Sequence, residues 1–163
     1  MDTELYQQIR TNQKEAETTV PGAKNITWLI FTAGKDTFAL EPGEVREIVR
    51  NTEIYPLPFV PAYIKGVLNR HGDPYTVVDI SSFLGNEELS ENLFLILNDD
   101  NDIALRISEV REFHAAGEND LKKLSDSSRS DYFCGAVSYD LITASVLNVT
   151  GIIGKIRTDL ENS

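Results

Sequence analysis

Few side chains in this sequence are of the types that carry out covalent or metal chemistry. The two histidines, His71 and His114, lie far apart in the chain with no obvious third metal ligand. Cys134 is the only cysteine, which excludes an internal disulfide and a multi-cysteine zinc site. It sits in an apolar stretch, where we expect a small buried side chain. No Gly-x-Ser-x-Gly elbow marks a serine nucleophile. These residues predict no catalytic centre, cofactor or metal.

Two short patterns come near ligand-binding motifs and then depart from them. Residues 151–155, Gly-Ile-Ile-Gly-Lys, hold too few residues between the glycines for a phosphate loop, and Ile156 replaces the Ser or Thr. The polar run 98–102 lacks the spacing, the glycine and the terminal glutamate of a calcium loop. We expect helix surface at the first and a solvated turn at the second.

The composition excludes several classes of partner. The net charge of −11 over 163 residues repels nucleic acids and anionic membranes, which require Lys and Arg. No stretch approaches the roughly 18 apolar residues of a membrane span. The first ten residues lack the basic and then apolar pattern of a secretory signal. We expect a cytoplasmic protein without nucleic-acid binding or direct membrane insertion.

Short β-strands separated by turn signals dominate the sequence from residue 26 onward. Val, Ile and aromatic residues recur in short runs bounded by Gly, Pro, Asn and Asp, as is typical of strands. The run 93–97 is uniformly apolar, as expected for a strand buried on both faces. We expect strands or hairpins at 26–41, 67–78, 93–97, 103–107 and 132–149. Their spacing indicates a barrel or sandwich.

The connecting segments are less regular. The spacing at 45–49 suits either a helix or a strand. Pro56, Pro58 and Pro61 predict a loop that packs its apolar side chains, Leu57, Phe59 and Tyr63, over apolar surface. We expect a helical turn at 79–85, and a polar loop at 115–131 with one helical turn near 120–124.

The two ends of the chain differ. Residues 1–25 are polar and predict a flexible extension. Asn148 is a good helix cap, and the apolar residues after it fall on one helical face: Val149, Ile152, Ile153, Ile156 and Leu160. We expect a C-terminal helix and one body over 26–161.

The stretch from Val60 to Ile80, VPAYIKGVLNRHGDPYTVVDI, resembles the signature of CheW-like domains, P-x-x-I-x-G-V-x-N-L-R-G-x-V-V-P-V-V-D-L. Other blocks of this family follow in order and at suitable distances. They are the V-x-E-I segment at Val45–Ile48, an opening hairpin with Trp28 and Phe38, a strand at Ile107–Val110, Gly135, and the closing helix after Asn148. The resemblance covers residues 27–158.

The resemblance implies a fold and a role. Members of this family are mainly β, with two packed five-stranded SH3-like barrels and a C-terminal helix. They are not enzymes. They link methyl-accepting chemoreceptor cytoplasmic tips to the regulatory domain of a CheA-type histidine kinase, and can meet other CheW-like domains. By this analogy the partner-binding residues are Val45, Glu47, Ile48, Ile64, Gly66, Asn69, His71, Gly72 and Asp79. Ile64 and Val67 are expected to be core residues, and Asp79 to cap the helical turn.

One departure concerns the arginine of the family signature. His71 stands in its place, with Arg70 before it, and the family match places His71 opposite Glu47. An Arg–Glu pair is permanently charged, whereas a His–Glu pair is charged only when the histidine is protonated. We expect His71 to face Glu47, with Arg70 as the alternative. Thr76 and Ser81 depart from the signature as well.

Three functions remain open at this point. An adaptor of a chemotaxis pathway fits the resemblance, and an adaptor of a related motility or other signalling pathway fits the departures. A small barrel that binds oligonucleotides or sugars is the third, although the charge opposes nucleic acid.

Overall fold

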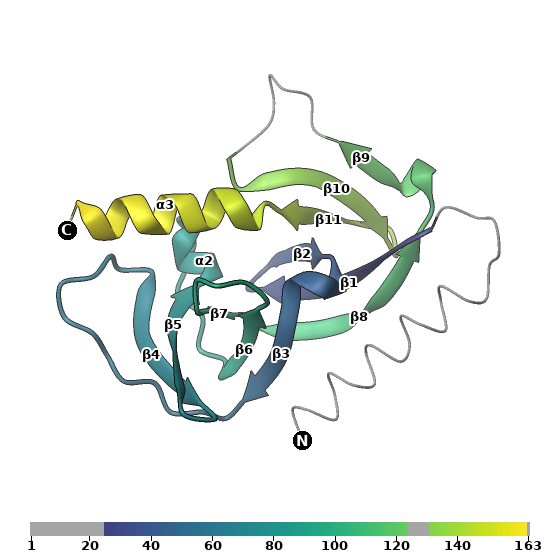
Figure 1. The fold of residues 1–163 in the computed structure, drawn as a ribbon. Helices are drawn as coiled ribbons and strands as arrows, with labels where there is room; N and C mark the ends of the chain where they lie inside the picture. Colours follow the sequence, from purple (N-terminus) through teal and green to yellow (C-terminus); the bar gives the residue numbers. More distant parts are fainter. Residues whose placement is uncertain (1–24, 124–130, 163) are drawn as a thin grey trace.

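The computed structural model describes residues 25–123 and 131–162. The extension predicted at 1–25 lies outside these ranges except for Asn25, and so does part of the loop predicted at 115–131. The chain is mainly β, with two sheets and a C-terminal helix (Figure 1).

The first sheet contains six strands. Their spatial order is β8 (Glu109–Ala116), β1 (Ile26–Ala33), β2 (Asp36–Leu40), β11 (Ile142–Leu147), β10 (Phe133–Tyr139) and β9 (Leu121–Lys123). All neighbours are antiparallel except β2 and β11. Strand β10 also contacts β8, so the sheet curls into a barrel. We call it barrel one.

The second sheet contains five strands in the order β3 (Val45–Arg50), β6 (Leu93–Leu97), β7 (Ile103–Arg106), β5 (Asp73–Asp79) and β4 (Ile64–Arg70). An antiparallel bridge between Tyr55, which follows β3, and Val67 of β4 brings its two ends together. We call this curled sheet barrel two. The chain leaves barrel one after β2, builds barrel two, and returns at β8, so both ends of the described chain contribute to barrel one.

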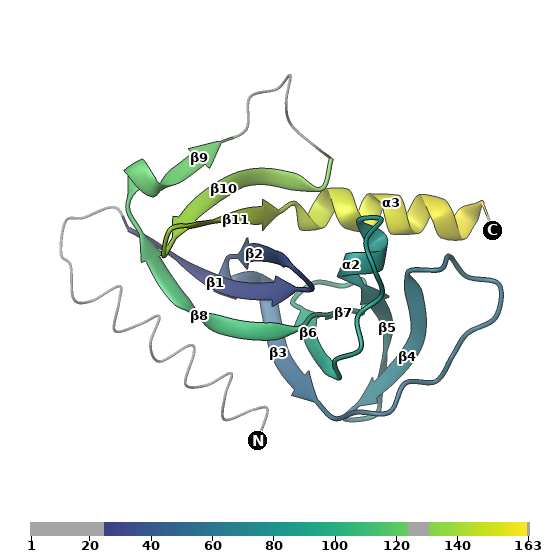
Figure 2. The same ribbon diagram turned by 180° about the vertical axis from the view of Figure 1, so that it is seen from behind.

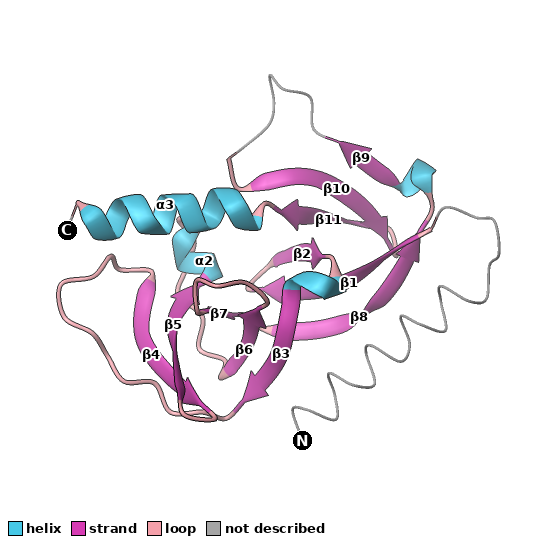
Figure 3. Cartoon of the chain, viewed as in Figure 1, coloured by secondary structure: helices cyan, strands magenta, loops and turns pink. Residues whose placement is uncertain are grey.

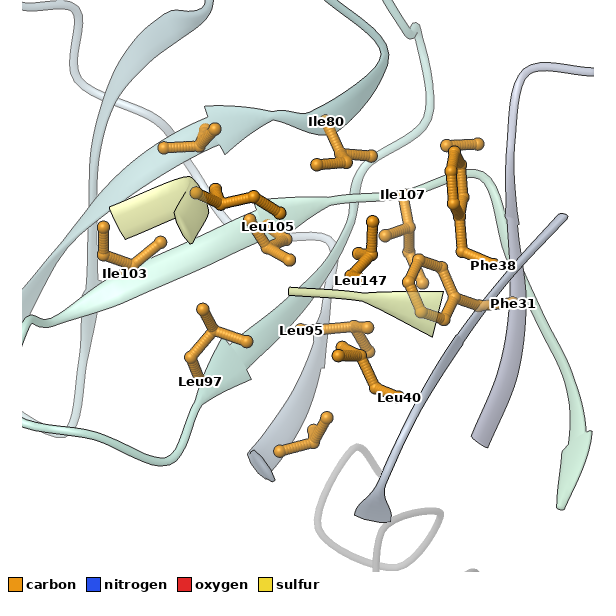
Figure 4. Close-up of a cluster of buried hydrophobic side chains, with 14 of the residues drawn as sticks. Phe31, Phe38, Leu40, Ile80, Leu95, Leu97, Ile103, Leu105, Ile107 and Leu147 are labelled. Atoms are coloured by element: carbon orange, nitrogen blue, oxygen red, sulfur yellow. The ribbon is translucent and has the colours of Figure 1, made fainter. Parts of the chain in front are cut away.

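The buried side chains form three clusters that follow from strand alternation. Trp28 and Ile30 point into barrel one, whereas Leu29 and Phe31 of the same strand point toward barrel two. Strand β6 alternates in the same way between the inside of barrel two and the layer between the barrels. This is why its sequence is uniformly apolar. Figure 4 shows the shared layer, where Phe31 and Leu40 meet Leu95 and Leu105.

Helices cover one end of this shared layer. The short helix α2 (Ile80–Phe83) follows β5, and α3 (Val149–Glu161) follows β11. Ile152 and Ile156 of α3 are buried in the shared layer, and Leu160 at its far end is exposed. The Asn148 side chain accepts from Gly151 N, which confirms the predicted cap. Two short 3-10 turns, η1 (Pro42–Glu44) and η2 (Glu118–Asp120), complete the elements.

The predicted architecture is confirmed, and several local expectations are corrected. Residues 45–50, where the spacing suited either a helix or a strand, form a strand. The helical turn predicted near 120–124 is wrong at 121–123, where β9 gains backbone bonds by pairing with β10. Barrel one therefore has a sixth strand. Cys134 is exposed rather than buried, because a bulge between Phe133 and Gly135 shifts the register around it.

Candidate protein-docking surface

The closing seam of barrel two is held by an ion pair between its two edge strands. Arg70 of β4 donates to Glu47 of β3 through two nitrogens, Nε at 2.9 Å and Nη2, both reaching Oε1. The two side chains are mostly buried, with exposed fractions of 25% and 15%. Charge-assisted hydrogen bonds that are shielded from water are stronger than exposed ones. The pair therefore fixes the distance between β3 and β4.

Of the two expected partners of Glu47, Arg70 makes the hydrogen bonds, and His71 comes only within ion-pair distance. The His71 side chain is 72% exposed, and its Nε2 lies 3.9 Å from Glu47 Oε1, beyond hydrogen-bonding distance. The reason is the turn between β4 and β5, where His71 (φ 54°) and Gly72 (φ 86°) are both left-handed. Arg70 is still in the strand and reaches β3, whereas His71 begins the turn and points to solvent. Asn69 Oδ1 accepts from Gly72 N at 3.1 Å and braces the turn.

Gly66 allows the chain after β3 to lie directly on β4. Tyr55 and Val67 exchange two backbone hydrogen bonds, both 2.8 Å long. A Cβ at Gly66, whose φ is 141°, would lie 2.2 Å from the Tyr55 carbonyl oxygen. No side chain fits in that space, so the sequence requirement for glycine is steric.

The segment from Tyr55 to Tyr63, which we call the proline loop, projects beyond β4 at the edge of barrel two (Figure 3). Its predicted packing is wrong for most of its length. Tyr55 and Leu57 are about half exposed, and Phe59 is 93% exposed. Only Val60 and Tyr63, at its far end, pack against the shared layer. The loop is anchored at both ends, and its prolines keep the middle extended and away from the core.

Phe59 has a backbone conformation that an aromatic residue adopts at a cost. Its φ of 58° lies in the left-handed region, which disfavours a residue with a Cβ by roughly 1–2 kcal/mol. The ring recovers none of this by packing. The sequence pattern of three prolines predicted a loop, but nothing in it distinguished an outward ring from an inward one.

Five of the nine predicted partner-binding residues are buried. Val45, Ile48 and Ile64 belong to the shared layer, and Gly66 lies under Tyr55. Asp79 has no exposed surface. These five residues present little surface to a partner.

Both carboxylate oxygens of Asp79 accept hydrogen bonds from backbone amides. Oδ1 accepts from Ser82 N at 3.0 Å, which caps α2 as predicted, and Oδ2 accepts from Leu89 N at 2.8 Å.

The remaining four predicted residues reach the surface and lie together. Glu47 is partly exposed at the seam, and Asn69, His71 and Gly72 are exposed at the β4–β5 turn beside it. The proline loop begins at Tyr55, which bridges to Val67 in the middle of β4, and it ends at Tyr63, at the end of β4 opposite the turn. The surface at the seam thus combines a charged pair with a polar turn, and the outward ring of Phe59 belongs to the adjoining loop.

A separate recess of about 500 Å³ lies on barrel one, between β2, β11 and α2. Its lining mixes polar side chains with four aromatic rings, of which Phe38 stacks on Phe133 and Phe83 lies edge-on to Tyr132. Within the described ranges no three His, Cys, Asp or Glu residues are grouped to hold a metal ion. Nor does any helix among those residues have the length and apolar character needed to cross a membrane.

Comparison with known proteins decides the family. A family model described as "CheW-like domain" matches residues 27–157, which is most of the chain. The chain belongs to the CheW-like domain family. The two curled sheets, the seam and the closing helix are therefore this chain's version of the CheW-like fold.

Two individual proteins that resemble this chain differ in how much of it they match. The chain is 39% identical to the chemotaxis protein CheW of Rhizobium meliloti (strain 1021) over 57 residues, which are 35% of this chain. The match spans only 37% of that protein's length. The crystal structure of the scaffolding protein TtCheW from Thermoanaerobacter tengcongensis superposes with a TM-score of 0.68 at 18% identity. The superposition covers 76% of this chain and 89% of TtCheW, and it shows that the two share a fold.

Proposed function

We propose that this protein is a non-catalytic adaptor of a chemotaxis pathway in the cytoplasm. It couples the cytoplasmic tips of methyl-accepting chemoreceptors to the regulatory domain of a CheA-type histidine kinase. The observation that carries the proposal is membership of the CheW-like family across residues 27–157. The names of the two relatives, a chemotaxis protein and a scaffolding protein, point in the same direction.

The surface at the seam of barrel two supports a role in binding protein. Glu47, Asn69, His71 and Gly72 would contact a partner, and the five buried residues described above would hold them in place. Phe59 would act as an anchor, because hot spots of protein interfaces are commonly aromatic. Its proline flanks reduce the conformational entropy that binding must overcome.

The experiment measures binding of the purified chain to the kinase regulatory domain and to receptor tip fragments from the same cell, by calorimetry. We expect binding to at least one of them, weakened tenfold or more by Glu47→Gln. Arg111→Ala is the matched control, because Arg111 forms an exposed pair with Glu109 on barrel one, 3.6 Å apart. Absence of binding to both fragments would sink the adaptor role.

A further inference from the structure

Helix α3 is tied to barrel two at its far end by hydrogen bonds rather than by apolar burial. Tyr63 Oη donates to Asp159 Oδ2 at 2.6 Å, and Arg157 Nη2 donates to Asn101 Oδ1 at 2.6 Å. Lys155 Nζ also pairs with Asp159, 2.8 Å from Oδ1. Figure 2 shows α3 lying across α2 and reaching toward the ends of β4 and β5. The helix therefore spans from barrel one to barrel two.

Three aromatic rings run alongside the helix and connect the same two barrels. Tyr63 meets Phe83 of α2 edge-on, with ring centroids 4.9 Å apart at 82°. Phe83 meets Tyr132 in the same way, at 4.9 Å and 72°. Tyr132 O accepts from the backbone N–H of Asn148, the cap of α3. The rings are thus fastened to the start of α3 through Tyr132 and to its end through the bond between Tyr63 and Asp159.

The helix contact and the ring contacts meet at Tyr63, where the proline loop joins β4. Tyr63 is the last residue of that loop and directly precedes β4. Its carbonyl oxygen accepts from Asp79 N at 2.9 Å, which joins the loop to the capped start of α2. A change in the position of α3 therefore reaches the loop through one side chain, Tyr63.

We propose that Tyr63 and Asp159 form a latch by which helix α3 positions the proline loop. Both are positioning residues, since the exposed rings of Tyr55 and Phe59 lie farther along the loop. With the latch closed, the loop is held at Tyr55 by β4 and at Tyr63 by α3. With the latch open, the Tyr55 end keeps its restraint, whereas the Tyr63 end is held only by its backbone bond to Asp79 and its ring contact with Phe83. The proposal concerns how the docking surface of the proposed function is regulated, but the latch can be tested without any partner.

The helix is built so that the latch can open. Only Ile152 and Ile156 of its residues are fully buried. Gly154 lies in its interior on the exposed side, where glycine weakens a helix relative to alanine. A Cβ at Gly154 would meet nothing within 4 Å, so Gly154→Ala strengthens the helix without a clash. The chain thus offers variants that loosen and tighten the same device.

Hydrogen exchange of backbone amides in the full chain tests the latch. The reporters are the amides of Ile64, which donates to Pro61 O, and of Asp79, which donates to Tyr63 O, and the reference is Ser108 N, which donates to Thr32 O in barrel one. Tyr63→Phe and Asp159→Ala should each speed exchange at the reporters roughly three- to tenfold, the factor expected for one hydrogen bond. The double variant should be no faster than the faster single one. Gly154→Ala should slow the reporters, and the reference should not change.

Arg157→Ala is the matched control, because it removes a bond of the same length from the same helix without touching Tyr63. It should leave the reporters unchanged. Unchanged reporters in Tyr63→Phe and Asp159→Ala would overturn the latch, and so would equal acceleration of the reference or of the Arg157→Ala reporters. If a loosening variant fails to fold, Gly154→Ala alone decides, since unslowed reporters contradict the proposal. If the unmodified chain binds neither partner fragment, the proposed function is contradicted, but the exchange rates still test the latch.

Discussion

Glu47 is hydrogen-bonded by Arg70, the residue before the position of the signature arginine, which His71 occupies. Arg70 donates twice to Glu47 Oε1, whereas His71 points to solvent. We predict that Arg70→Ala destabilises the chain by about 1.5–3 kcal/mol, because the mostly buried Glu47 then loses both of the hydrogen bonds that Arg70 donates. His71→Ala should cost less than about 0.5 kcal/mol, as exposed substitutions do. Urea unfolding measures both, and equal effects would mean that His71 shares the pairing.

Gly66 and Gly72 both have positive φ, but they require glycine for different reasons: lack of space at Gly66 and backbone conformation alone at Gly72. A Cβ at Gly66 would collide with the Tyr55 carbonyl, whereas a Cβ at Gly72 meets nothing within 4 Å. We predict that Gly66→Ala costs about 3 kcal/mol or more, since the backbone must move and the Tyr55–Val67 bridge is lost. Gly72→Ala should cost only about 1–2 kcal/mol, the price of its backbone conformation. Unfolding midpoints that fall equally in the two variants would refute the steric explanation.

The signature residues illustrate what can be predicted at this scale. The Asp79 cap and the Asn148 cap follow from local chemistry, and the structure has both of them as expected. The choice between Arg70 and His71 does not, because it depends on where the strand ends and the turn begins. A shift of one residue changes which side chain crosses the seam.

At the scale of elements, the sequence predicts the partners within a hairpin but not the partners of strands that are distant in the chain. The turn signals and apolar runs placed the hairpins of β1–β2, β4–β5 and β10–β11 correctly. Strands β7 and β8 are neighbours in the sequence but belong to different barrels, and nothing in their residues predicts this. Strand β9 was missed because Leu121–Lys123 is short and polar and becomes a strand only through pairing with β10.

The proline loop and the β10–β11 turn each expose a large apolar residue in a left-handed conformation. Phe59 has φ 58° and Leu141 has φ 64°, and neither is packed. Asparagine tolerates this conformation better. We predict that Phe59→Asn and Leu141→Asn each stabilise the chain by about 0.5–1 kcal/mol in urea unfolding. Phe59→Asn should also weaken partner binding at least about tenfold. Leu141→Asn is the control and should not, and equal binding losses would remove Phe59's special role.

At the scale of the whole molecule, the two barrels are one folding unit. Strand β1 sends alternate side chains into barrel one and into the shared layer, and β6 does the same for barrel two. Neither barrel can be separated without exposing that layer. The uniformly apolar run 93–97 predicted one strand that is buried on both faces, but the division of its side chains between barrel two and the shared layer follows only from the complete topology.

The latch between α3 and barrel two gives the whole molecule a defined pH response. Bonds from Lys155 and Tyr63 lower the pKa of the Asp159 carboxyl. Burial and the neighbouring Asp159 raise the pKa of the Tyr63 hydroxyl well above its usual range. Because the pKa of Asp159 is lowered in the folded state, its ionised carboxylate stabilises the fold above about pH 4. This stabilisation is lost as the pH falls through the pKa of the folded state. A raised tyrosine pKa stabilises it below about pH 10, and the gain is lost as pH rises further. The stability difference between the unmodified chain and Tyr63→Phe should therefore stay constant from about pH 5 to 9 and shrink on both sides. Urea unfolding across this range checks it, and a difference that changes near neutral pH would show that another group controls the latch.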